Sequence, residues 1–346
     1  MNDVIDPDWA YCQEALNRVS RTFSQPIRML PPDLGRAVTC GYLLCRLVDT
    51  IEDDAALPLP LRDRLYAAFL DVVERRAGPE SLAALALEAF PPERPTGPGL
   101  AKLDEVALFH ELPAIWRVLH TTPRAMVEGV LPWVAEMGRG MAIYSHRARG
   151  EDGVQALLTA GDLERYCFFV AGTVGHMLTA LFTAALPGLA PDRHRALLNH
   201  TEDFALGLQL TNILKDVAED LERGVSFIPR TAFAEAGLDG PRDLRSPRYT
   251  AAFRAAVAPT FARARAALDG ALSYTLALPP EATGLRLFCV LPLVMAVRTL
   301  TVAEASDSSA PPKISRDEVY RLIDRALREV GDDDALTRWV EELKRP

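Results

Sequence analysis

The chain has 346 residues, enough for one large domain or two ordinary ones, and 49% of the residues are hydrophobic. Charged residues make up 25%, which is typical of a soluble globular protein. The formal net charge of −9 disfavours nucleic acid as a partner, because a nucleic-acid backbone is bound by excess positive charge. Any anionic substrate must therefore be held locally, by arginines or by a metal ion.

Cysteine usage and the opening residues indicate the compartment. The five cysteines are scattered and include no CxxC pair, which predicts reduced thiols in the cytoplasm. The opening sequence MNDVIDPDWAYC has no basic segment followed by an apolar one, so no signal peptide is expected. We therefore expect a cytoplasmic protein.

Helical periodicity runs through nearly the whole chain, with apolar residues three or four apart and no clean alternation of the strand type. Prolines separate the segments at residues 31–32, 58–60, 91–99, 279–280 and 311–312. The segments between them are long enough for helices of about 10 to 25 residues. No internal repeat or low-complexity linker interrupts them, so one all-α domain is predicted.

The first helix with chemical character is predicted around residues 42–53. Tyr42, Arg46, Asp49 and the pair Glu52 and Asp53 recur at helical spacing beside an apolar stripe, so they share one face. Like charges at this spacing repel by about 0.2–0.5 kcal/mol per pair. The pattern indicates either a solvated helix end or a positive ion among the carboxylates.

Residues 168–190 form an apolar run that is long enough to cross a bilayer, with His176 as its one ionisable group. Gly172, Gly175 and Pro187 interrupt the run, and a single isolated span fits the rest of the chain poorly. We therefore predict a fully buried helix of a large helical protein.

A second polar stripe follows at residues 206–223, again beside apolar residues at helical spacing. Its members are Gln209, Asn212, Asp216, Glu219, Asp220 and Arg223. Polar residues aligned on otherwise apolar helices suggest the lining of a cavity. If the two acidic stripes face each other, their oxygens suit Mg²⁺, which is commonly held by one or two carboxylates, water and substrate phosphate.

The spacing acid-x-x-acid-acid occurs three times, whereas composition alone predicts about one occurrence. The third copy, Glu329, Asp332 and Asp333, contains a glycine and lies in a polar tail, so we predict a solvated helix end. No HExxH, P-loop or strand-GxGxxG-helix pattern is present, and the histidines are expected to be structural or exposed. The glycines of MGRGMA and GTVG indicate close helix packing.

Several of these motifs together resemble the squalene/phytoene synthase family of head-to-head prenyl-diphosphate synthases. The resemblance rests on VDTIEDD, NILKDVAED, SRTFS, EMGRGMA and RYCFFVAGTVG, and it extends from about residue 10 to residue 305. It implies an isoprenoid-synthase-type helical bundle around a central hydrophobic cavity, with residues 1–346 as a single catalytic domain.

Within the family, DTIED and FCVLPLVMA are similar to squalene synthases of the bacterial type, whereas LTNILKDV and SFIP are similar to phytoene synthases. Leu293 stands where squalene synthases usually carry Gln, and Ser315 replaces an expected basic residue. We expect no counterpart of the C-terminal anchoring helix of the eukaryotic enzymes. We still expect that the protein contacts the inner face of the membrane peripherally when it releases its product.

The resemblance implies a Mg²⁺-dependent squalene synthase (farnesyl-diphosphate farnesyltransferase). Two farnesyl diphosphates would be joined through presqualene diphosphate, which NADPH would reduce to squalene. The implied metal ligands are Asp49, Glu52, Asp53, Asp216, Glu219 and Asp220.

The same resemblance implies roles for other residues. Tyr166 would handle a proton near the carbocation, or else be a core tyrosine. Phe23, Phe169 and Phe288 would line the substrate pocket or simply pack in the core. The implied diphosphate-binding residues are Arg21, Arg46, Lys215 and Arg223, with Tyr42, Gln209 and Asn212 beside the substrate and Lys313 and Arg316 holding the NADPH phosphates.

Two other functions stay open at this point. A non-reducing member of the family would make dehydrosqualene, hydroxysqualene or phytoene, and the NADPH step has no nucleotide-binding motif to support it. A catalytically inactive helical assembly factor is the second alternative, against which the intact acidic motifs and Tyr166 argue. The prenyl chain length and the oligomeric state do not follow from the sequence.

Overall fold

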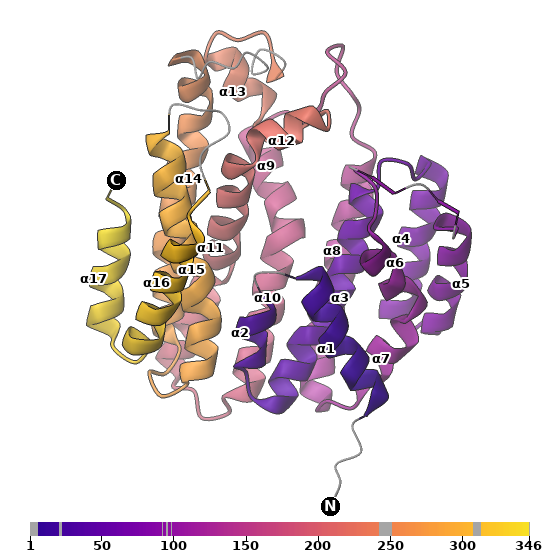
Figure 1. Ribbon diagram of the computed structural model, residues 1–346, viewed down its shortest axis with the longest axis horizontal. Coiled ribbons are helices and arrows are strands. Elements are labelled where there is room, and N and C mark those ends of the chain that lie inside the picture. Colours follow the sequence, from indigo (N-terminus) through magenta and orange to yellow (C-terminus); the bar gives the residue numbers. More distant parts are fainter. Residues whose placement is uncertain are drawn as a thin grey trace, which may run out of the picture. The chain divides into compact units, whose positions relative to one another are not determined.

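The computed structural model describes residues 6–20, 23–91, 93–94, 96–97, 99–241, 251–306 and 313–345. Within these ranges the chain is helical almost throughout, and the two short strands form one parallel pair. Figure 1 shows this succession of helices along the chain. The all-α fold class predicted from the sequence is confirmed.

Internal contacts divide the chain into two compact units. Unit 1 comprises residues 1–146 and 176–188, and unit 2 comprises residues 147–175 and 189–346. The prediction that residues 1–346 act as one catalytic domain remains a prediction.

Unit 1 is built from α1 to α8 and the later part of α10. Its helices are α1 (Pro7–Val19), α2 (Ser24–Arg28), α3 (Pro32–Asp53), α4 (Leu59–Val73), α5 (Pro79–Ala89), α6 (Leu103–His110), α7 (Leu112–His120), α8 (Arg124–Ser145) and α10 (Thr173–Ala185). The buried helix α3 packs on α8, α1 and α7.

Unit 2 contains the strands and the longest helices. Its elements are β1 (Gln155–Ala156), α9 (Ala160–Cys167), the π-helix η1 (Phe168–Gly172), α11 (Pro191–Lys215), α12 (Val217–Glu222), β2 (Val225–Ser226), α13 (Arg230–Glu235), α14 (Ala251–Ala277), α15 (Thr283–Ala305), α16 (Arg316–Glu329) and α17 (Asp333–Leu343). The pairing of α11 with α14 is the most extensive, and Figure 1 shows the two side by side.

Prolines mark helix starts, as the sequence predicts. Pro7, Pro32, Pro79 and Pro191 occupy the first helical positions of α1, α3, α5 and α11. This position suits proline because its ring fixes a helical φ and because the first N–H groups of a helix have no partner within the helix.

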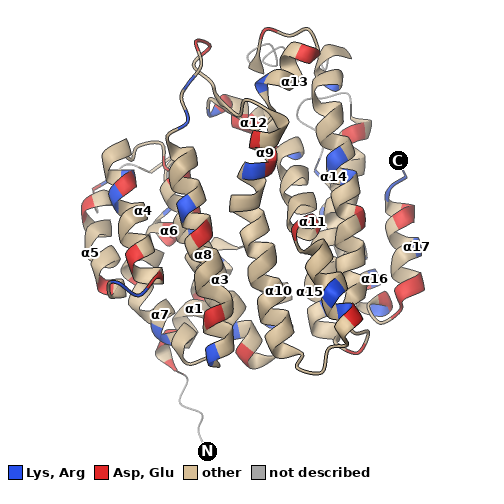
Figure 2. Cartoon of the chain, turned by 180° about the vertical axis from the view of Figure 1, so that it is seen from behind, with Lys and Arg blue, Asp and Glu red and all other residues tan. Residues whose placement is uncertain are grey.

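The apolar run at residues 168–190 does not form the single buried helix that was predicted. A π-turn at Phe168–Gly172 separates α9 from α10, and the helix ends at Ala185. Two helical stretches of the described chain are long and apolar enough to cross a membrane. In Ala160–Ala185, half of the most apolar 18-residue window is buried inside the protein. In Thr283–Ala305, 78% of the corresponding window is buried. Helix α10 carries no Lys, Arg, Asp or Glu and is uniformly tan in Figure 2.

The third acidic cluster lies at a helix end where Asp332 is exposed, as predicted, but its acids also make specific contacts. Asp332 caps α17 by accepting a hydrogen bond of 2.8 Å from Ala335 N. Asp333 forms an ion pair with Arg286, whose side chain is fully buried. Arg286 also donates to the carbonyl oxygen of Val330 over 2.9 Å. These groups connect α15 to the start of α17.

The predicted close helix packing is confirmed at the second glycine of GTVG, Gly175. A Cβ atom on Gly175 would lie 2.6 Å from the carbonyl oxygen of Thr201 and 3.1 Å from Ala205 Cβ. Gly175→Ala should lower the free energy of unfolding by about 1–3 kcal/mol, because backbone atoms cannot move aside cheaply.

Urea unfolding measures this difference. Gly161→Ala is the matched control, because the nearest atom to a Cβ there is Thr159 Oγ1 at 3.7 Å. Alanine has the higher helix propensity, so the control should be neutral or more stable by up to about 1 kcal/mol. Equal stability of the two variants would show that Gly175 does not lie against Thr201 and Ala205 as described.

Candidate active site

Helix α3 brings together the first set of predicted residues. Arg46 Nη2 donates to Tyr42 Oη over 3.1 Å, and Arg46 Nη1 lies 3.6 Å from Asp49 Oδ2. The ring of Phe23 lies 6.1 Å from that of Tyr42, centroid to centroid. All four side chains are half-buried, so the shared face predicted from the spacing exists.

Asp49 has an unusual electrostatic environment. Burial raises the pKa of its carboxyl to about 6, while Arg46 lowers the pKa and Asp53 and Glu105 raise it further. The side chain keeps 31% of its surface exposed, so solvent reaches it even though neighbouring protein atoms desolvate the carboxylate. A raised pKa means that the charged form is poorly compensated by the protein, and an added cation would compensate it.

The last acid of LVDTIEDD has a structural role instead. Asp54 is fully buried and accepts hydrogen bonds from the backbone N–H groups of Ala56, over 2.9 Å, and Ala101, over 2.8 Å. It also forms an ion pair with Arg94. Asp54 therefore ends α3 and holds the following loops, whereas Glu52 is half-buried and Asp53 is exposed.

The second acidic motif begins at a helix break rather than on the continuous helix that was predicted. Helix α11 ends at Lys215 and α12 begins at Val217, with Asp216 between them at φ −106° and ψ 11°. Lys215 Nζ lies 3.0 Å from Asp216 Oδ2 and 3.5 Å from Asn212 Oδ1. The break sets Asp216 at the junction of the two helices.

Cations contact the other two acids of this motif. Arg223 Nη2 donates to Asp220 Oδ1 over 2.5 Å, and Asp220 is 6% exposed. Lys313 Nζ lies 3.5 Å from Glu219 Oε1, and both side chains are exposed. Lys313, predicted to bind NADPH, therefore lies beside the acidic motif.

Most of the remaining predicted residues belong to unit 2. Gln209 is half-buried on α11 and Asn212 is exposed. Phe288 is 3% exposed on α15, in agreement with the alternative that it packs in the core. Arg316 is exposed at the start of α16, where Ser315 caps the helix by accepting from Glu318 N over 3.1 Å. Arg21 lies outside the described residues.

Tyr166 is 4% exposed near the end of α9. Its ring stacks on that of Phe227 with a centroid distance of 4.9 Å and an interplanar angle of 24°. The guanidinium carbon of Arg147 lies 5.1 Å from the Tyr166 centroid and 5.7 Å from the Phe227 centroid.

Among the residues that the structure describes, no three His, Cys, Asp or Glu side chains gather as a self-sufficient metal site. Mg²⁺ commonly takes only one or two carboxylates and completes its shell with water and substrate phosphate. The oxygen-only donors and the poorly compensated carboxyl of Asp49 fit such an ion.

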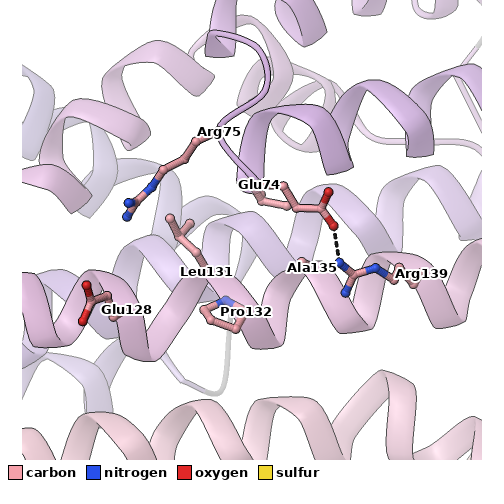
Figure 3. Close-up of a pocket in the computed structure, with 8 residues that line it drawn as sticks. Glu74, Arg75, Glu128, Leu131, Pro132, Ala135 and Arg139 are labelled. Carbon is pink, nitrogen blue, oxygen red and sulfur yellow. Dashed lines mark hydrogen bonds and ion pairs between the residues drawn. The ribbon is translucent and has the colours of Figure 1, made fainter.

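A cavity of about 420 Å³ opens between α4 and α8 in unit 1 and contains none of the predicted site residues. Figure 3 shows Arg75 and Glu128 at one end of the cavity and the ion pair of Glu74 with Arg139 at the other. Leu131 and Pro132 lie between them. Its acids and bases balance, so its charges favour neither an anion nor a cation, and we assign the chemistry to the acidic motifs.

Comparison with known proteins identifies the family. A family model described as squalene/phytoene synthase matches residues 16–319. The chain belongs to the squalene/phytoene synthase family. It is similar to squalene synthase ERG9 of Candida albicans, with 29% identity over 304 residues. The alignment covers 86% of this chain and 62% of that relative, so the chain spans less than two thirds of the relative's length.

Solved structures of the family share the fold. A ligand complex of TcSQS superposes with a TM-score of 0.79 at 23% identity, covering 98% of this chain and 90% of that one. A ligand complex of a dehydrosqualene synthase gives a TM-score of 0.61 at 19% identity, covering 94% and 96%. The chain thus has a helical fold of the squalene synthase type.

Sequence reasoning missed several residues around the family motifs. Glu105 acts on Asp49 from helix α6, and Asp54 is held by Arg94. Arg147 and Phe227 surround the predicted tyrosine. Phe227 and Asp54 carried a signal, because they lie within the SFIP and VDTIEDD motifs.

Proposed function

We propose that this squalene/phytoene synthase family member is a Mg²⁺-dependent head-to-head transferase that joins two farnesyl diphosphates through presqualene diphosphate and reduces the product to squalene with NADPH. The observation that carries the proposal is Asp49. Its carboxyl lies on a mostly buried helix, remains accessible to solvent and has a pKa raised to about 6. Such a group favours a bound cation.

The acidic motifs would bind the metal that holds each substrate diphosphate. Asp49, Glu52 and Asp53 provide the oxygens of one motif, and Asp216, Glu219 and Asp220 those of the other. Bound Mg²⁺ would neutralise the charge that develops on a departing diphosphate. Arg46, Lys215 and Arg223 already lie beside these acids and would donate hydrogen bonds to the diphosphate oxygens.

Tyr166 would handle the proton lost when the cyclopropane of presqualene diphosphate closes. The C–H bond that breaks supplies the electron pair of the new ring bond, and the proton leaves to an acceptor. Contact with Phe227 and Arg147 occupies ring surface of Tyr166, which favours action through the hydroxyl group.

The reductive step would require a site for the NADPH phosphates. Lys313 and Arg316 are the candidates for the NADPH phosphates, and Lys313 lies beside Glu219 of the second acidic motif. Leu293 is 1% exposed, so its apolar side chain suits its place in α15. NADPH would supply the hydride that adds to the carbocation formed after the second diphosphate leaves. Without this step the product from farnesyl diphosphate would be dehydrosqualene or hydroxysqualene, and phytoene would form only from the longer prenyl diphosphate.

Removal of the metal tests the proposal directly. The protein should lose turnover of labelled farnesyl diphosphate in excess EDTA and regain it on addition of Mg²⁺, because bare carboxylates repel a diphosphate. Circular dichroism in EDTA should be unchanged, since the described ion pairs hold the fold without metal. Undiminished turnover in EDTA would contradict the metal role of both motifs.

A further inference from the structure

The candidate proton-handling residue Tyr166 lies in a three-membered group with Arg147 and Phe227. The Tyr166 and Phe227 rings stack at 4.9 Å, and the guanidinium of Arg147 lies within 5.7 Å of both ring centroids. A guanidinium at this distance from an aromatic face is attracted by the ring quadrupole. The three groups therefore restrict one another's orientation.

The backbone around Arg147 and Phe227 is fixed by the only strand pair of the described residues. Gln155 Nε2 donates to the carbonyl oxygen of Arg147 over 2.7 Å. Gln155 is also the first residue of β1, and it pairs with Val225 of β2. Phe227 follows directly after β2. The strand pair thus holds Arg147 and Phe227 in one frame.

Tyr166 is fixed from the other side by its helix. Thr159 and Asp162 form a capping box that sets the start of α9, with Thr159 Oγ1 accepting from Asp162 N over 3.2 Å. The π-turn η1 begins two residues after Tyr166. The backbone of Tyr166 is therefore set by α9, and the remaining freedom is rotation of the side chain.

We propose that Arg147 is a positioning residue for Tyr166: with Phe227, its guanidinium fixes the plane of the tyrosine ring and thereby the direction of its hydroxyl group. Arg147 acts through Tyr166 and does not itself transfer the proton.

The inference rests on the proposed function only for its effect on rate, and a spectroscopic test is independent of activity. 3-Fluorotyrosine replaces the 8 tyrosines, and the ¹⁹F resonance of residue 166 is identified by its loss in Tyr166→Phe. Arg147→Gln should shift and sharpen this resonance, because the ring gains freedom. An unchanged resonance would overturn the positioning role whatever the enzyme does.

Arg149→Gln is the matched control. Arg149 lies two residues further along the same segment, and its Nη1 donates to the carbonyl oxygen of Gly153 over 3.1 Å. The Arg149→Gln substitution removes the same charge and the same type of side chain as Arg147→Gln, but from an exposed position. The control should leave the resonance of residue 166 and the turnover unchanged. An equal shift in the control would assign the effect to net charge.

The kinetic test separates positioning from substrate binding. Arg147→Gln should lower kcat for presqualene diphosphate formation about 10–100-fold and change KM less than about twofold, because misplacement of a reacting group by about 1 Å costs up to 100-fold. In a Tyr166→Phe background the same change should cost less than about twofold, since the positioned group is gone. Full additivity, or a rise confined to KM, would overturn the proposal.

Arg147→Lys shows which property of arginine matters. Lysine keeps the charge and loses the planar surface that rests on the two rings. Recovery of less than half of the lost kcat, with the ¹⁹F resonance still shifted, is the expected result. If lysine restores both, charge alone places the ring, and planar packing against Tyr166 and Phe227 is refuted.

Discussion

Asp49→Ala and Asp216→Ala should each lower turnover of farnesyl diphosphate at least about a thousandfold while the protein stays folded. The stabilisation of the departing diphosphate by metal is worth several kcal/mol, and each 1.36 kcal/mol is a tenfold change in rate. Both side chains keep about 30% of their surface exposed, 31% for Asp49 and 29% for Asp216. Their truncation therefore leaves no buried cavity, and the free energy of unfolding should change by less than about 1 kcal/mol.

Asp54→Ala is the contrasting variant from the same acidic run. Asp54 is fully buried and paired with Arg94, and removal of one partner of a buried pair costs about 3–5 kcal/mol. It should unfold at markedly lower urea, whereas Asp49→Ala should unfold near the wild-type midpoint. Near wild-type turnover by Asp49→Ala would refute the metal assignment, and unchanged stability of Asp54→Ala would refute its structural role.

Tyr166→Phe should slow formation of presqualene diphosphate about 10²–10⁴-fold, the usual contribution of a placed proton-transfer group. Substrate binding should be nearly unchanged, because the phenyl ring keeps its stacking on Phe227 and its contact with Arg147. Rapid-quench measurement of the first half-reaction, with binding followed separately, gives both quantities. A wild-type rate for the first half-reaction would make Tyr166 a core tyrosine.

The shared face of Tyr42, Arg46 and Asp49 could be predicted because a helix places residues three and four apart side by side. Such local rules fix which side chains are neighbours within one helix. Local residue chemistry also predicted the proline boundary at residues 31–32 and the close packing at Gly175.

The role of Asp54 could not be predicted, because two of its partners, Arg94 and the N–H of Ala101, are remote in sequence. Arg94 and the N–H of Ala101 lie more than 35 residues away, and nothing local distinguishes Asp54 from Asp53. The contact of Lys313 with Glu219 is equally remote. The helix break at Asp216 is different, because an apolar stripe continues through it and hides the change in backbone direction.

The central claim is that the chain couples two farnesyl diphosphates and reduces the product. Incubation of the purified protein with labelled farnesyl diphosphate and Mg²⁺, with and without NADPH, tests it most directly. We expect squalene with NADPH. Without NADPH we expect presqualene diphosphate, together with alcohols or dehydrosqualene from its unquenched cation. The same product under both conditions would contradict the reductive step and favour a non-reducing synthase, and no coupled product from either farnesyl diphosphate or the longer prenyl diphosphate would contradict the catalytic assignment itself.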